Sequence, residues 1–487
     1  MGLSLALNTA RASLLTASTQ IGVSARNVAG ATDPSYSRKI AALVPGGGTA
    51  ALLITRATDA ALLDRKLSAT SASAGSDALL DGLQRLSRTV GDTADPTAPA
   101  ARLGALNAAM QAAANRPDDT DLARAAVAAA RDLAGSLNEA AATVHGIRAD
   151  TDAAIQDSVA RVNDLLGQFG LANQAVAKGM SIGGDISDAL DDRDRILTQL
   201  SQDVGITTVS RGGGDLAIYT DGGVPLFDRT ARTVSVQPTL VFVGGTVAAA
   251  VQIDGVPVTG AASPMPLGSG RLAGLAALRD EASVRYESQL DAMAGGLVAV
   301  FAEPDHGTSG AGPRAGLFAV DASATLPGSG GAAQVGLATR LRVASAVDPG
   351  QGGDPARLRD GGINGADYRD PAAGAAAYSG RLRVLTAALT GARSFDPSTQ
   401  ITGAATLQDF AAASAGWLEA ARKGASTDAA YQTTLLGRAT DALSNAVGVN
   451  GDDETALTLR LEQSYTASAK LLTVVNDLLN ALFDAVR

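Results

Sequence analysis

Three long stretches of this chain contain no proline: residues 1–33, 118–224 and 398–487. Proline in a helix interior removes a backbone hydrogen bond and costs about 3 kcal/mol, so these stretches are where long helices are permitted. Two of them are the ends of the chain, and the third lies near its middle. The proline distribution therefore predicts long helices at both ends and in the centre.

The two ends carry matching apolar stripes. Apolar and small residues recur there at alternating spacings of four and three, which is the 3.5-residue repeat of a coiled-coil seam. Two such helices most simply pack on each other, although an ordinary core helix at each end would show a similar pattern. A second stripe, at Tyr465, Leu472, Leu479 and Val486, widens the apolar face of the last helix. We predict an assembly seam formed by Leu3, Leu7, Leu14, Ile21 and Val28 and by Leu457, Leu461, Leu471, Val475, Leu478 and Leu482.

A third helical region extends from residue 121 to about residue 179. Its apolar residues continue the four–three spacing from Ile155 to Val176. At 1.5 Å per residue, one unbroken helix here would be roughly 90 Å long, which indicates a rod or a hairpin of helices. The same reasoning predicts shorter helices at about 57–92, 101–115, 185–203, 271–302 and 403–447.

The pattern changes at Val204. Short β-branched runs separated by Gly-rich turns and Asp-Gly pairs predict strands and hairpins up to residue 270. Residues 303–400 are rich in Gly, Pro and Ala without clear periodicity, and we expect loops with a few short elements. The fold class is therefore multidomain and mainly α, with long helices, a terminal coiled-coil pair, a helical rod and a β-rich inserted domain. The expected domains are 1–40 with 450–487 (paired ends), 41–203 with 271–302 and 401–449 (rod), 204–270 (β-rich) and 303–400 (irregular, part of an outer domain).

Composition excludes several functions. The net charge of −10 disfavours nucleic-acid and anionic membrane surfaces, and no apolar run is long enough to span a bilayer. The chain has no cysteine and only two histidines, which leaves little for thiol catalysis or a transition-metal site. The acidic segment DISDALDDRDR lacks the Gly and Glu of a calcium loop, and exposed ion pairs between neighbouring helix turns explain it better. We predict no enzymatic activity, no cofactor and no metal.

The sequences at the two ends resemble a known family. SARNVAGATDPSYSRK is similar to the N-terminal signature of bacterial flagellar axial proteins, with matches at Asn27, Thr32, Tyr36 and Arg38. Gly30 stands where a second Asn is usual, and Asp33-Pro34-Ser35 replaces the usual Pro-Gly. The tail resembles the family's C-terminal pattern of an acidic helix start followed by small residues near a Gln and a Tyr, with matches at Gln463, Tyr465, Ala467 and Ala469.

The middle of the chain narrows the resemblance. ISDALDDRDRILTQLSQDVGITTV, LAIYTDGGVPLF and SGRLAGLAALRDEASVRYESQLDAMAGGLVAVF follow one another as in the flagellar hook-associated protein 1 family. The resemblance implies a self-assembling structural protein at the junction between hook and filament, whose terminal helices pair in an inner tube. It also implies secretion through the flagellar type III channel without a cleaved signal, and a location in the extracellular flagellum.

The same resemblance implies the partners. They are identical subunits in a ring, the flagellar hook protein, the second hook-associated junction protein, and a cytosolic export chaperone that holds the C-terminal helix. Alternatives are a hook or distal-rod protein of the same class, or an axial protein with an enzymatic insertion at 303–400. The block DDRDRILTQLSQDVG argues against the first alternative, and the Ala/Gly-rich composition of 303–400 argues against the second.

Overall fold

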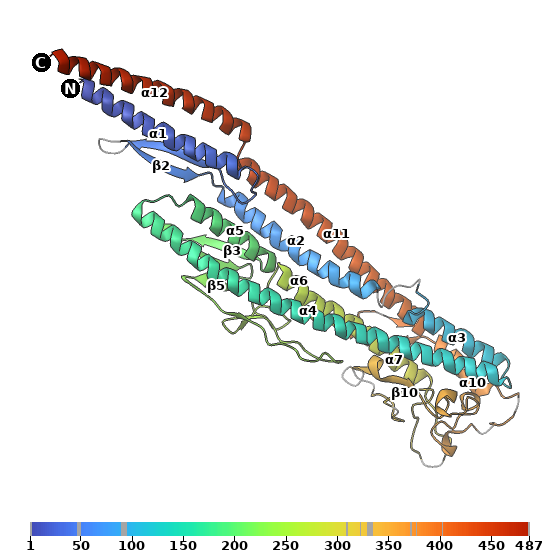
Figure 1. Cartoon of the computed structure of the whole chain (residues 1–487). Helices are drawn as coiled ribbons and strands as arrows, with labels where there is room; N and C mark the ends of the chain where they lie inside the picture. Colours follow the sequence, from blue (N-terminus) through green and yellow to red (C-terminus); the bar gives the residue numbers. More distant parts are fainter. Residues whose placement is uncertain are drawn as a thin grey trace.

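The protein is an elongated rod with its two chain ends side by side at one tip (Figure 1). The computed structural model describes residues 2–45, 50–88, 95–307, 310–321, 323–328, 335–370, 373–375, 377–401 and 403–485. Long helices run along the rod, and small antiparallel sheets lie on its flank and at its far end. The fold is therefore mainly α and multidomain, as the sequence predicts.

The tip consists of the first and last helices, α1 (Gly2–Gly30) and α12 (Gly451–Ala485), which pack along each other. A hairpin of β1 (Lys39–Pro45) and β2 (Ala50–Arg56) follows α1 and lies beside it. The side chain of Gln20 on α1 donates a hydrogen bond to the carbonyl of Ala41 at 3.2 Å, which fixes the hairpin against the helix.

The next level of the rod is a second helix pair, α2 (Ala60–Leu86) and α11 (Leu407–Val447). Both helices begin at capping side chains, since Asp59 accepts from the N–H of Leu62 and Thr406 from that of Asp409. The chain passes from α11 to α12 through only three residues, 448–450. The terminal pair is therefore attached to the rod by this short connection and by the segment 31–59, which contains the hairpin.

The longest element is α4 (Thr120–Ile182), one unbroken helix of 63 residues. Asp119 caps its start, and Gly183 ends it in the left-handed conformation, with φ of +67°. At 1.5 Å per residue it is about 95 Å long, so the rod expected from the sequence exists. From its end the chain returns along it as α5 (Ser187–Asp203).

Three further helices complete the rod. Helix α3 (Pro99–Asn115) packs on α4, and α6 (Arg271–Ala277) joins α7 (Ser283–Val300) through one π-helical turn at Leu278–Ala282. The glycines of GSGRLAG allow α6 to approach α2 closely, because a Cβ at Gly274 would lie 2.1 Å from the carbonyl oxygen of Gly75. This motif therefore serves helix packing.

The β-rich stretch lies on the flank of α4. One four-stranded sheet has the order β3–β4–β5–β6, with β3 at Ile206–Ser210, β4 at Leu216–Thr220, β5 at Pro225–Asp228 and β6 at Thr230–Ala231. A three-stranded sheet follows, with β7 at Val234–Ser235, β8 at Gln252–Ile253 and β9 at Val256–Pro257. Their buried side chains share one core with α4 and α5, where Phe169 meets Phe227 edge to face at 4.9 Å. The β-rich stretch therefore shares its core with the helices of the rod.

Residues 303–400 form the far end of the rod. Their described elements are short, as the sequence predicts: β10 (Phe318–Val320), α8 (Leu337–Arg340), β11 (Leu341–Val343), α9 (Arg357–Asp360), α10 (Gly380–Thr390) and β12 (Arg393–Ser394), which pairs with β13 (Ala404–Ala405). Their apolar residues join a core with α3, α4, α7 and α11. This end is irregular in backbone but well packed.

Candidate functional site: the terminal helices and their joint to the rod

The interface between α1 and α12 is made largely of small side chains. Ala10 and Ala17 of α1 and Val475 of α12 are buried. Hydroxyl groups cross the interface as well, with Ser13 and Ser468 in contact at 2.8 Å and Ser24 and Thr458 at 3.0 Å. Small residues let the two helices approach closely, but they remove little apolar surface from water.

The structure places the predicted seam residues in three groups. Leu7, Leu14, Ile21, Leu457 and Leu461 are half-buried and Val475 is buried, so these six lie at or near the helix interface. Val28, Leu471 and Leu478 are instead 46%, 50% and 52% exposed. The side chains of Leu3 and Leu482 lie outside the described residues.

Leu471 and Leu478 of the predicted assembly seam therefore remain half exposed in the isolated chain. Beside the buried Val475, Leu472 and Leu479 of the second stripe are half-buried, whereas Tyr465 of the same stripe is exposed. Leucine stands at both neighbouring positions in each turn, so periodicity alone does not choose between the two stripes. Leu471, Val474 and Leu478 therefore form an apolar face of α12 that no other described part of the chain covers.

At the base of the terminal pair, Glu454 joins three segments of the chain. Its side chain is buried and accepts hydrogen bonds from Ser24 at 2.6 Å and from Arg38 at 2.7 Å. Burial opposes ionisation, but the hydrogen bonds from Ser24, Arg38 and Asn27 outweigh it and lower the pKa of Glu454. The carboxylate therefore stays charged and ties the end of α1 and the start of the hairpin to the start of α12.

Asn27 holds the turn that follows α1. Its side chain is buried, donates to the carbonyl of Lys39 at 2.9 Å and accepts from the N–H of Lys39 at 2.9 Å. The hydroxyl of Tyr36 also donates to it at 3.0 Å. Burial raises the pKa of Tyr36 to about 12, so this hydroxyl keeps its proton. Three signature residues, Asn27, Tyr36 and Arg38, thus close this joint together.

Ion pairs hold the β1–β2 hairpin against helix α5 of the rod. Lys39 pairs with Asp188, and Arg56 pairs with Asp191 at 2.9 Å and with Asp194 at 2.6 Å, all on α5. We expected the acidic segment of α5 to form exposed ion pairs within its own helix. Only Asp192 and Arg195 do so, at 3.0 Å, because the face with Asp191 and Asp194 turns toward the hairpin. These partners lie more than 130 positions apart, so local sequence patterns do not indicate them.

The other signature residues do not take part in the joint. Thr32, Gln463, Tyr465 and Ala467 are exposed and Ala469 is half-buried. The structure therefore divides the signature in two. One part holds the joint within the chain, and the other lies on the surface of the terminal pair.

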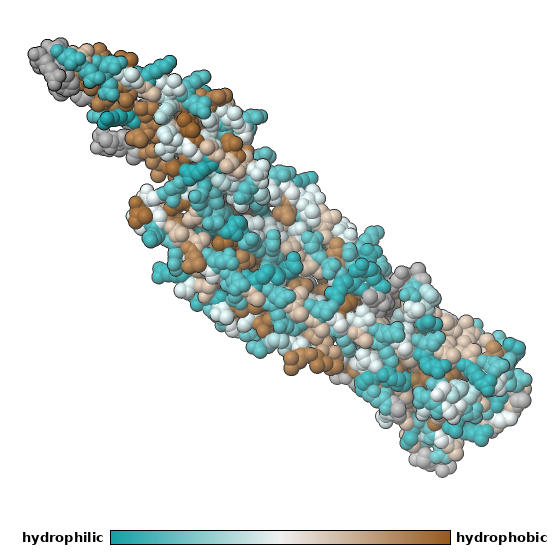
Figure 2. All heavy atoms as spheres, viewed as in Figure 1, coloured by the Kyte–Doolittle hydropathy of each residue, from teal (hydrophilic) through white to brown (hydrophobic). Residues whose placement is uncertain are grey.

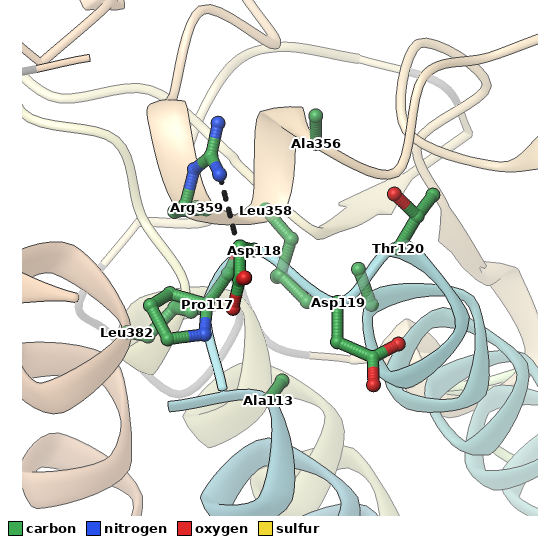
Figure 3. Close-up of a pocket in the computed structure, with 10 residues that line it drawn as sticks. Ala113, Pro117, Asp118, Asp119, Thr120, Ala356, Leu358, Arg359 and Leu382 are labelled. Atoms are coloured by element: carbon green, nitrogen blue, oxygen red, sulfur yellow. Dashed lines mark hydrogen bonds between the residues drawn. The ribbon is translucent and has the colours of Figure 1, made fainter. Parts of the chain in front are cut away.

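The cavity at the far end of the rod is small. A cavity of about 100 Å³ lies where α3 and α4 meet the far end, lined by Pro117, Asp119, Thr120, Arg359 and neighbouring residues (Figure 3). Arg359 donates to the carbonyl of Pro117 at 3.1 Å and pairs with Asp360, so its guanidinium group already has partners within the chain. The volume is below the 300 Å³ or more of most ligand sites. Among the described residues no group of metal-binding side chains occurs, and no described helix is long and apolar enough to cross a bilayer.

Residues 83–306, which include α3 to α7 and the β-rich flank, match the family model described as the flagellar hook-associated protein FlgK helical domain. Over these residues, a little under half of the chain, the protein is similar to the FlgK helical domain. A solved structure, that of the flagellar hook junction protein FlgK from Burkholderia pseudomallei, is similar at 23% identity over 53% of this chain and 46% of that one, with a TM-score of 0.42. The match thus spans about half the length of that FlgK. No curated protein matches the chain in sequence.

Proposed function

We propose that this chain is a structural subunit of the bacterial flagellum that assembles into the junction between hook and filament. The match of residues 83–306 to the FlgK helical domain carries the proposal. The geometry supports it, because the terminal helices form a slender pair with an uncovered apolar face at the tip of a rigid rod. Such a pair suits polymerisation into a tube better than it suits catalysis or small-molecule binding.

In this proposal the terminal pair is the polymerisation surface. The face of α12 with Leu471, Val474 and Leu478, and the exposed Leu5 and Leu15 of α1, would be covered by neighbouring copies. The predicted assembly seam then divides into residues that join α1 to α12 and residues that join one subunit to the next. The ion-paired joint would fix the angle between the tube and the rod.

The proposed partners follow from the same role. They are identical subunits in a ring, hook protein on one side, the second junction protein on the other, and a cytosolic chaperone on the C-terminal helix before export. The proposed location is the extracellular flagellum, reached through the flagellar type III channel. An enzymatic insertion at 303–400 gains no support from the small cavity at that end.

Deletion of the gene tests the proposal directly. Electron microscopy of flagella from the deletion strain should show hooks without filaments, and expression of this chain should restore the filaments. The full-length protein should also be found by immunogold labelling at one band between hook and filament. Normal filaments in the deletion strain would contradict the proposed function.

A further inference from the structure

The loop between β7 and β8, residues 236–251, is unusually apolar and exposed. Leu240 and Val247 are 94% and 92% exposed, more than any other large hydrophobic side chain that the structure describes. Val241 and Val243 are 67% and 55% exposed. The loop contains no Asp, Glu, Lys or Arg. We call residues 236–251 the apolar loop; Figure 2 shows hydrophobic surface on the flank of the rod where Figure 1 places it.

Side chains of α4 and of the π-helical turn hold this loop by its backbone. Arg148 donates to the carbonyl of Thr246 at 2.6 Å and lies 4.8 Å from the ring of Phe242, which is buried. Arg279 donates to the carbonyl of Ala249 at 2.9 Å. Asp152 accepts from the N–H of Thr239 at 3.1 Å. The loop is therefore anchored on both sides of its exposed residues.

Arg148, Arg279 and Asp152, which hold the loop, are themselves buried and charged. Arg148 pairs with Glu287 at 3.2 Å, and Arg279 pairs with Asp152. Buried ion pairs contribute little net stability, but they require one defined arrangement of their partners. A Cβ at Gly244 would lie 2.5 Å from the Cα of Gly336, so backbone packing also fixes the turn of the loop. The backbone that carries the exposed aliphatic side chains is therefore held in one defined arrangement.

The exposed part of the loop also has backbone groups without hydrogen-bond partners among the described residues. The N–H and C=O groups of Leu240, Val241 and Phe242 form no hydrogen bond to any other described residue. Val241 and Val243 are exposed while Phe242 between them is buried. An apolar segment whose backbone groups are unpaired is a surface on which another polypeptide can pack.

We propose that the apolar loop is a contact surface for a second copy of this chain in the assembled structure, a proposal that rests on the function proposed above. Each copy carries a net charge of −10, so two copies repel except where they meet through uncharged surface, and the loop supplies such surface. The loop lies on the flank of the rod away from α11 (Figure 1).

The size of the surface also favours a second copy. Four aliphatic side chains bury far less than the roughly 800 Å² per partner of a stable complex. Such a contact forms only between molecules that another interface already holds side by side. The terminal helices provide that interface for identical copies, so the loop would be covered in the assembly and free in the isolated chain.

A photo-cross-linking experiment tests this directly. Because the chain has no cysteine, Leu240→Cys gives one attachment point for a maleimide–benzophenone probe. Illumination of isolated flagella should give a product of twice the 48.6 kDa chain mass, and the dilute soluble protein should not. The matched control is Val384→Cys on α10, which is 68% exposed at the far end and should give no such product.

The outcomes separate this inference from the proposed function. A labelled chain that is present on flagella but cross-links only to a different protein, or to none, overturns the second-copy proposal and leaves the junction role intact. A chain that is never found on flagella, labelled or not, overturns both.

A paired substitution gives a second measurement. Leu240→Ser with Val247→Ser should leave the melting temperature of the soluble chain within about 2 °C, because both side chains are exposed. Under shear, the amount of the variant retained on flagella should fall about tenfold relative to Val384→Ser. Equal retention of the two variants would overturn the proposal.

Discussion

Arg38 donates a hydrogen bond at 2.7 Å to the buried carboxylate of Glu454, a residue 416 positions further along the chain. The contact joins the segment after the first helix to the start of the last one. Ser24 binds the other oxygen of the same carboxylate at 2.6 Å. The two ends of the chain are therefore held at the base of the terminal pair, while the contact along the pair depends on small side chains.

Glu454→Gln should loosen this joint. The amide keeps the shape of the side chain but loses the charge that Arg38 pairs with, and a hydrogen bond to a charged group contributes about 2 kcal/mol. We expect faster hydrogen–deuterium exchange in residues 24–39 and faster proteolysis at 448–450. The matched control is Glu462→Gln, on the exposed side of α12, which should behave as the wild type.

The joint should also weaken in acid. The pKa of Glu454 is lowered in the folded chain, so its contribution is fully present above the unfolded value of 4.5 and is lost as the pH falls through the folded value. Exchange in residues 24–39 should therefore rise below about pH 4.5 in the wild type. In Glu454→Gln it should be high already and change less with pH. An identical pH response in both proteins would contradict the role given to this carboxylate.

The pH dependence that Asp291 contributes to stability should be opposite to that of Glu454. Burial raises its pKa to about 6, although the N–H groups of Gly336 and Ala338 bind it at 2.7 and 2.8 Å. The unfolded chain loses this proton first as the pH rises, so the free energy of unfolding should fall between pH 3.8 and about 6. The shift corresponds to a change on the order of 3 kcal/mol. Thermal unfolding over this range should show the decrease in the wild type, and Asp291→Asn should reduce it.

Phe227→Ala should destabilise the rod as a whole. Phe227 is buried and packs edge to face on Phe169 of α4, so its removal leaves a cavity in the core that strands and helices share. A loss of about 3–5 kcal/mol is expected. Val209→Ala on β3, where the side chain is 46% exposed, is the control and should cost far less. If chemical denaturation gives equal values for the two variants, the packing of Phe227 on Phe169 does not stabilise the rod.

The long helices could be predicted because they depend on local sequence. Proline-free stretches and a 3.5-residue repeat are visible without a partner, and α1, α4 and α12 appear where the pattern predicts them. The joint could not be predicted in the same way. The partners of Lys39 and Arg56 lie about 150 and 135 positions away on α5, and only the folded chain brings them together. The face of α12 was ambiguous because leucine occupies both members of the pairs 471/472 and 478/479.

The two faces of α12 should respond differently to charge. Val475 is 6% exposed against α1, so Val475→Asp buries an unpaired charge between the helices, at a cost of several kcal/mol. It should separate α1 from α12 in the isolated chain, with a loss of helical circular dichroism and rapid proteolysis of both ends.

Leu471→Asp with Leu478→Asp places two charges on the face that α1 does not cover, since these side chains are half exposed. The isolated chain should keep the helical signal and protease resistance of the wild type. Its assembly should nevertheless fail, because neighbouring copies would have to bury those charges. Motility and filament attachment in a strain that expresses only this variant provide the measurement. Wild-type swimming would show that this face of α12 is not part of the polymerisation surface, and unfolding of the terminal pair in the isolated variant would show that these leucines do contact α1.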